Sequence, residues 1–156
     1  MENKLIHPSA VIEPGAIVAN DVTIGPFSYI GAEVILHPGV QIKSHVVVTG
    51  KTEIGQESVV YSFAVIGEIP QDLKFKGEKT SLKIGKRNQI RENVTINVGT
   101  AGGGGLTSVG NNCLFMTGSH VAHDAKIGDN VIIANCGAVA GHCVIEDGVI
   151  IGGLSG

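Results

Sequence analysis

Aliphatic residues recur every six positions along most of this chain. The first run of hexads is headed by Ile6, Ile12, Val18, Ile24, Ile30, Leu36, Ile42, Val48, Ile54, Val60 and Ile66. The fifth position of each hexad is usually small or compact, as in Ala10, Ala16, Val22, Ser28, Val34, Val40, Val46, Thr52, Ser58 and Ala64, with Pro70 as the exception. A period of six with two apolar positions fits neither a 3.6-residue helix nor simple strand alternation. It predicts short strands separated by turns, with the first and fifth positions pointing inward.

Three such hexads, 18 residues, make one triangular coil of a parallel β-helix, and neighbouring coils stack about 4.8 Å apart. The register fails at residues 72–83 and again at 102–108. It resumes first at Ile84, Ile90 and Ile96, and then at Val109, Phe115, Val121, Ile127, Ile133, Val139, Ile145 and Ile151. We therefore expect an all-β fold in one domain over residues 1–156, with two loops bulging outward. Loops on a rigid repeat scaffold commonly carry binding residues.

Composition agrees with a scaffold of this kind. Glycine accounts for 23 of the 156 residues, aromatics for only 4%, and tryptophan is absent, so the core must consist of small and branched aliphatic side chains. The formal charge of −3 argues against a nucleic-acid-binding protein, which usually shows a basic face. The start MENKLIHPSA lacks the apolar region of a secretory signal, and no apolar run approaches the ~20 residues of a membrane span. We expect a cytoplasmic protein without disulfide bonds.

Candidate chemistry is concentrated in GSHVAHDAKIG, residues 118–128, and in the following AGHCVIEDG. Asp124 and His142 are 18 residues apart, which predicts that they stack one coil apart on the same face, beside His123 and near His120. All four side chains are expected to point outward. A neutral imidazole is a usual general base near pH 7, so His123 could deprotonate an acceptor hydroxyl while Asp124 orients its ring. The backbone N–H of Gly141 is a candidate oxyanion donor.

Other interpretations remain open at this point. His120, His123 and His142 could together bind zinc, as in the trimeric β-helix carbonic anhydrases, which also use histidines at subunit interfaces. A purely structural β-helix, such as an ice-binding wall, is less favoured because the outward positions are irregular. The GGGG run at 102–105 lacks the lysine and helix start of a phosphate loop, and we expect it to be a flexible loop.

The segments IGEIPQDLKFKGE, KRNQIRENVTI, GSHVAHDAKIGDN and AVAGH resemble the UDP-N-acetylglucosamine acyltransferases of lipid A biosynthesis, a hexapeptide-repeat family. The resemblance extends along essentially the whole chain, loops included. It implies a left-handed β-helix and transfer of an (R)-3-hydroxyacyl group from acyl carrier protein to the 3-hydroxyl of UDP-N-acetylglucosamine. Glucosamine N-acyltransferases of the same pathway share the hexads, but their flanking motifs differ from GSHVAHD.

The resemblance also assigns roles to individual residues. It implies His123 as the base, with Asp124 and Gly141 in the catalytic set, and Gln71, Asp72, Lys74, His120 and His142 in substrate binding. No metal or cofactor is implied, because the acyl group arrives on the phosphopantetheine arm of the carrier protein. Members are homotrimers with interfacial active sites. They read I-H-R-G-T where this chain has INVGT, at Asn97 and Val98, and their further coils and C-terminal helical domain are expected to be absent here.

Overall fold

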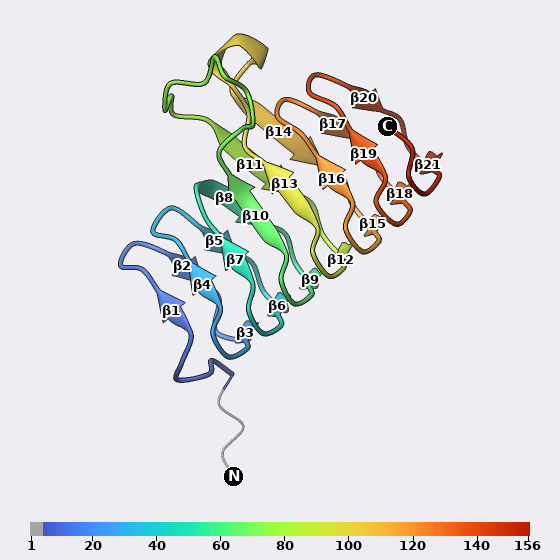
Figure 1. Cartoon of the computed structure of the whole chain (residues 1–156). Coiled ribbons are helices and arrows are strands. Elements are labelled where there is room, and N and C mark those ends of the chain that lie inside the picture. Colours follow the sequence, from blue (N-terminus) through green and yellow to red (C-terminus); the bar gives the residue numbers. More distant parts are fainter. Residues whose placement is uncertain (1–4) are drawn as a thin grey trace.

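A computed structural model describes residues 5–156 and shows three parallel β-sheets wound into a left-handed β-helix (Figure 1). Each sheet within this range contains seven strands, and each strand pairs with the strand one coil away. The expected fold class is confirmed. Residues 1–4 of the expected domain lie outside the described range. Between residues 5 and 156, the chain forms no helix whose length and apolar character would let it cross a membrane.

Most strands contain only two residues because a turn follows on each side of the triangle. The first sheet contains β1 (Val11–Ile12), β4 (Tyr29–Ile30), β7 (Val47–Val48), β10 (Val65–Glu68), β13 (Thr95–Asn97), β16 (His120–Val121) and β19 (Ala138–Val139). The second contains β2 (Ile17–Val18), β5 (Ile35–Leu36), β8 (Lys51–Ile54), β11 (Ser81–Ile84), β14 (Leu106–Val109), β17 (Lys126–Ile127) and β20 (Val144–Ile145). The third contains β3 (Thr23–Ile24), β6 (Gln41–Ile42), β9 (Val59–Val60), β12 (Gln89–Ile90), β15 (Leu114–Phe115), β18 (Ile132–Ile133) and β21 (Ile150–Ile151).

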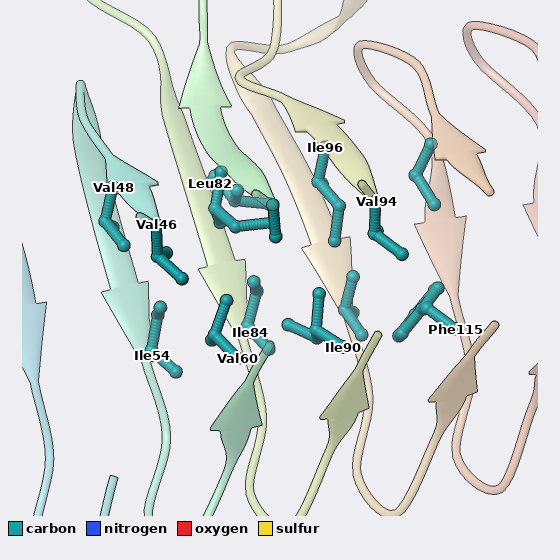
Figure 2. Packing of buried hydrophobic residues seen from close by; sticks show 14 of the residues in the cluster. Val46, Val48, Ile54, Val60, Leu82, Ile84, Ile90, Val94, Ile96 and Phe115 are labelled. Atoms are coloured by element: carbon teal, nitrogen blue, oxygen red, sulfur yellow. The ribbon is translucent and has the colours of Figure 1, made fainter. Parts of the chain in front are cut away.

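The core is the stack of inward side chains that the hexads predict. Ile54, Ile90 and Phe115 at first positions are fully buried, as are Val46 and Val94 at fifth positions. Figure 2 shows these side chains from successive coils lying against one another inside the triangle. Each coil therefore buries its aliphatic residues mainly against the coils above and below it, which makes the stack quasi-one-dimensional.

The turns between strands have a repeating backbone conformation. One residue in nearly every hexad has a positive φ, for example Phe27 (58°), Asp124 (60°) and His142 (64°). A positive φ is required at the third residue of a type II turn, whose second residue is often proline, as Pro26 is here. His123 and Gly141 occupy that second position in their own turns. The turn geometry therefore fixes where these two residues and their neighbours stand.

The two loops are displaced from their expected positions. The first lies at residues 69–80, between β10 and β11, and the second at 98–105, between β13 and β14, so the expected ranges of 72–83 and 102–108 were wrong. The reason is that Leu82 and Thr107 already belong to the stack: Leu82 pairs with Thr52 below it and with Thr107 above it. Leu82 occupies a fifth hexad position, which elsewhere holds small or compact residues, so the hexad register at this residue is not evident from the sequence.

The buried residue Asn88 connects the three coils that the two loops join. Asn88, fully buried at a fifth position, donates from Nδ2 to the carbonyl oxygens of Gly85 and Gly110, both at 2.9 Å. Its Oδ1 accepts the N–H of Cys113 at 2.8 Å, and its own N–H donates to Ser58 Oγ. All polar groups of this amide are therefore satisfied inside the core.

Replacing Asn88 by alanine is expected to lower the free energy of unfolding by about 3–5 kcal/mol. The Gly110 carbonyl and the Cys113 N–H would be buried without partners, and the Gly85 carbonyl would keep only its bond from Ser58 Oγ. Denaturant unfolding of the purified protein measures this. The matched control is Asn135→Ala at an exposed turn position, which should change stability by less than about 0.5 kcal/mol. A loss below about 1 kcal/mol at Asn88 would contradict the prediction.

Candidate active site

One corner of the β-helix, where strands of the first sheet lead into strands of the second, carries both loops and the predicted catalytic residues. The first loop follows β10 and the second follows β13 at this corner; His123 and Asp124 follow β16, and Gly141 and His142 follow β19. Four successive coils therefore contribute to one site. Figure 1 shows the two loops projecting from middle coils of the stack, at the top of the view and on the same side as the turns after β16 and β19.

His123 and Asp124 form a hydrogen-bonded pair. Nδ1 of His123 lies 2.8 Å from Oδ2 of Asp124. The imidazole is 15% exposed, whereas the carboxylate is only 1% exposed. The side chain of Asp124 leaves the coil as expected, but it is buried because the second loop covers it. A buried carboxylate on Nδ1 favours the tautomer that leaves Nε2 as the basic nitrogen.

Thr100, in the second loop, holds the other side of the carboxylate. Its N–H donates to Oδ1 of Asp124 at 2.8 Å, and its hydroxyl donates to Oδ2 at 2.6 Å. Thr100 also caps the short 3₁₀ turn η1 (Ala101–Gly103) by accepting the N–H of Gly103. The glycine-rich run, expected to be a flexible loop, contains this turn and covers Asp124. Sequence reasoning missed Thr100, and the signal available was a threonine two residues before a glycine run.

The environment of Asp124 stabilises its ionised form. Burial alone would raise the pKa of this carboxyl, but the two hydrogen bonds from Thr100 and the contact with His123 outweigh burial and hold the pKa below its ordinary value. Asp124 is therefore an anion at neutral pH and can stabilise a protonated imidazole at His123.

Gly141 lies directly under the imidazole of His123. A Cβ at position 141 would lie 2.6 Å from Cε1 of that ring, which is closer than real Cβ contacts, so only glycine fits against the ring in this position. Among residues 5–156, the N–H of Gly141 has no hydrogen-bond acceptor, as expected for the second residue of this turn type. An N–H that is free and adjacent to the base can serve as an oxyanion donor.

The two remaining histidines differ in their environments. The ring of His142 is 58% exposed, lies edge-on to His123 with 5.0 Å between centroids, and places Nδ1 3.8 Å from Oδ2 of Asp124. His120, in β16, lies half-buried one turn before His123, with its Nδ1 2.7 Å from the hydroxyl oxygen of Thr95.

A cavity of about 230 Å³ opens between the two loops. Its lining consists of Asp72, Lys74, Phe75, Glu78, Thr100, Gly102 and His142. The structure thus brings Asp72 and Lys74 to the same hollow as His142, next to the His123–Asp124 pair. Gln71 is exposed on the same loop but does not line this cavity, and neither does His120. The hollow combines cationic, anionic and aromatic groups, as a polar ligand with an anionic part would require.

The buried position of His120 makes a prediction for acid stability. Burial lowers the pKa of His120; a hydrogen bond with the Thr95 backbone opposes this shift and His123 adds to it, and the net pKa lies below the ordinary 6.5. Below pH 6.5 the unfolded chain binds a proton that the folded chain rejects, so the free energy of unfolding falls as the pH drops.

We therefore expect His120→Gln to reduce the loss of stability between pH 7.5 and pH 5. Denaturant unfolding at several pH values measures the slope, with His7→Gln scanned in parallel to correct for the removal of an imidazole. An unchanged slope in His120→Gln would contradict the prediction.

The donor atoms at this corner do not match the geometry of a zinc site. Among residues 5–156, His123, Asp124 and His142 have ligand atoms within 4.8 Å of one another, and His120 does not join them. The three-histidine zinc set considered from the sequence is therefore not assembled. Tetrahedral zinc would separate its nitrogen and oxygen ligands by roughly 3.4 Å, whereas Nδ1 of His123 and Oδ2 of Asp124 are at hydrogen-bond distance and Oδ2 also accepts from Thr100. The distance between Nδ1 of His123 and Oδ2 of Asp124 fits a hydrogen bond better than joint coordination of a metal ion.

Comparison with known proteins identifies the type of β-helix. A family model described as bacterial transferase hexapeptide (six repeats) matches residues 106–137. The chain is similar to LpxA from Acinetobacter baumannii, with 48% identity and a TM-score of 0.95 over 96% of this chain and 58% of that one. It is also similar to the UDP-N-acetylglucosamine O-acyltransferase of Moraxella catarrhalis (43% identity, TM-score 0.94, 96% and 58% covered). The UDP-N-acetylglucosamine acyltransferase of Campylobacter jejuni gives 43% identity and a TM-score of 0.91 at the same coverage.

The matched region includes nearly all of this chain, both loops among it, but the chain spans only 58% of the length of these three structures. Its sequence and its fold agree with one group of β-helix proteins. By these criteria the chain belongs to the hexapeptide-repeat transferases and corresponds to the β-helix of the UDP-N-acetylglucosamine acyltransferases.

Proposed function

We propose that this chain carries the active-site corner of an O-acyltransferase, which transfers an (R)-3-hydroxyacyl group from acyl carrier protein to the 3-hydroxyl of UDP-N-acetylglucosamine, the first step of lipid A biosynthesis. The observation that supports this most is the His123–Asp124 pair under a folded loop, within a β-helix 43–48% identical to three acyltransferases of this type.

His123 would act as the general base. Its Nδ1 is engaged with Asp124, and Nε2 has no hydrogen-bond partner within residues 5–156, so Nε2 is available for the proton of the acceptor hydroxyl. As the proton moves to Nε2, the hydroxyl oxygen forms a bond to the thioester carbonyl carbon. The resulting imidazolium is stabilised by the anionic Asp124.

The Gly141 N–H would then donate to the oxyanion of the tetrahedral intermediate. Collapse of the intermediate breaks the carbon–sulfur bond, and the leaving thiolate takes the proton from Nε2. The base is thereby regenerated without a covalent enzyme intermediate. No step requires a cofactor, since the carrier protein brings the activated acyl group.

The loops would bind the acceptor. Lys74 supplies a cation and Asp72 a carboxylate at the cavity between the loops, and His142 closes its inner end. We also assign Gln71 and His120 to substrate binding, outside the lining of this cavity. We further propose a cytoplasmic homotrimer in which a second subunit covers the exposed side of His142 and excludes water from the reaction.

The direct test is an acyl-transfer assay with UDP-N-acetylglucosamine and (R)-3-hydroxyacyl carrier protein on the full chain. We expect an ester at the 3-hydroxyl and no product from an acceptor that lacks this hydroxyl. Formation of an amide product from an amino-substituted acceptor alone would place the protein with the N-acyltransferases. Elemental analysis of the purified protein tests the zinc alternative, and stoichiometric zinc would refute the metal-free mechanism.

A further inference from the structure

Thr100 makes more hydrogen bonds to Asp124 than His123 does. Its backbone N–H donates to Oδ1 at 2.8 Å, and its side-chain hydroxyl donates to Oδ2 at 2.6 Å. Two donors on two oxygens fix the rotation of the carboxylate about its Cβ–Cγ bond. The same Oδ2 that receives the Thr100 hydroxyl lies 2.8 Å from Nδ1 of His123. The orientation of the oxygen that meets the imidazole is therefore set by Thr100.

The loop around Thr100 leaves the hydroxyl little freedom. Its oxygen accepts the N–H of Gly103 at 3.2 Å, so its own hydrogen must point to Asp124. Gly103 packs so closely on the carboxylate that any Cβ there would overlap it, and a Cβ on Gly99 would lie 2.8 Å from Oδ1. On the side of the coil, the backbone N–H of Asp124 donates to the hydroxyl oxygen of Thr107 at 2.8 Å. The carboxylate is thus enclosed by backbone on the loop side and by the coil on the other.

We propose that Thr100 is a positioning residue for catalysis, which acts through Asp124 to keep the imidazole of His123 in its Nδ1–H tautomer with Nε2 free for the acceptor hydroxyl. This inference rests on the proposed function of His123 as the base. Physically, a carboxylate held with Oδ2 in the plane of the imidazole is a hydrogen-bond acceptor only, so the ring must donate from Nδ1. A carboxylate that can rotate, or that water can reach, no longer enforces this choice.

The decisive variant is Thr100→Val, which removes the hydroxyl with little change in shape and retains the backbone N–H. In the full chain we expect kcat to fall roughly tenfold, the fold-change that corresponds to loss of one hydrogen bond to a charged group, with KM changed less than about threefold. Selective ¹⁵N labelling of histidine should show a smaller Nδ1–H fraction for His123. The pKa of Asp124 should rise, because a hydrogen bond that lowers it has been removed.

Two controls separate positioning from folding. Thr100→Ser keeps the hydroxyl and should restore kcat and the His123 tautomer to near the parent values. Thr117→Val removes a hydroxyl that donates to the carboxylate of Glu92 at 3.2 Å, away from His123, and should alter neither quantity. If Thr100→Val keeps the parent kcat and tautomer, the proposal is overturned. It is equally overturned if kcat falls and Thr100→Ser does not restore it, since the hydroxyl would then not be the acting group.

Failure of the proposed function would have a different signature. If the parent protein transfers no acyl group, while Thr100→Val still shifts the His123 tautomer and Thr100→Ser restores it, the acyltransferase assignment falls and the positioning role stands. The tautomer measurement needs neither substrate nor activity, so the two conclusions remain independent.

Discussion

Replacing His123 by alanine is expected to lower kcat for acyl transfer by about two to four orders of magnitude, the range that a positioned general base contributes. The imidazole of His123 has a free nitrogen, is partly exposed and is oriented by a buried carboxylate. KM should change little, because His123 does not line the cavity that contains Lys74 and Asp72. Steady-state kinetics with both substrates varied measures the two effects separately.

The matched control for this substitution is His7→Ala, an exposed histidine in the N-terminal coil, where its N–H bonds to the carbonyl oxygen of Ile24; this variant should leave kcat unchanged. Chemical unfolding should show that both variants remain folded, since His123 contributes no packing to the core. Undiminished transfer by His123→Ala would reject the assignment of the base.

Asp124→Asn is expected to have an effect of similar size, on the order of 10³- to 10⁴-fold in kcat, with almost no change in shape. Thr100 presents two donors to this side chain, and its backbone N–H cannot be turned into an acceptor. The amide oxygen would therefore face that N–H, and the amide NH₂ would face Nδ1 of His123. The ring would respond by moving its proton to Nε2, where it can no longer accept one.

Histidine ¹⁵N spectroscopy checks this tautomer change directly, alongside kinetics. Asp129→Asn is the matched control, because that carboxylate also accepts a backbone N–H, from Asn111 at 2.6 Å, but has no imidazole partner. Retention of the Nδ1–H tautomer in Asp124→Asn, together with near-parent kcat, would contradict the orienting role of Asp124.

The fold followed from the sequence to an unusual degree because the hexads encode it locally. Each aliphatic residue at a first position, such as Ile54 or Ile90, meets the equivalent residue one coil away, so no long-range information is needed to place it. The alignment of Asp124 with His142 follows from the same 18-residue spacing. The loop boundaries did not follow, because Leu82 occupies a position that elsewhere holds small residues.

The environment of the site was less predictable than its location. Asp124 was expected on an outer face, but its burial depends on the second loop, in which Thr100 lies 24 residues earlier in the chain. Nothing in the repeat indicates that a glycine-rich insertion folds back on the next coil, since insertions have no register with it. The contact becomes evident only when the loops after β10 and β13 are seen to leave the same corner as the turns after β16 and β19.

The turn that holds His123 and the turn that holds Gly141 are consecutive rungs of one ladder, joined by the hydrogen bond from the N–H of His142 to the carbonyl oxygen of His123. The backbones that carry the proposed base and the proposed oxyanion donor are therefore separated by the repeat distance of the β-helix, about 4.8 Å. In the proposed reaction, this backbone spacing would keep the separation of the two catalytic groups constant. The loops inserted in the preceding coils could change in length and composition, and with them the accepted ligand, without altering that separation.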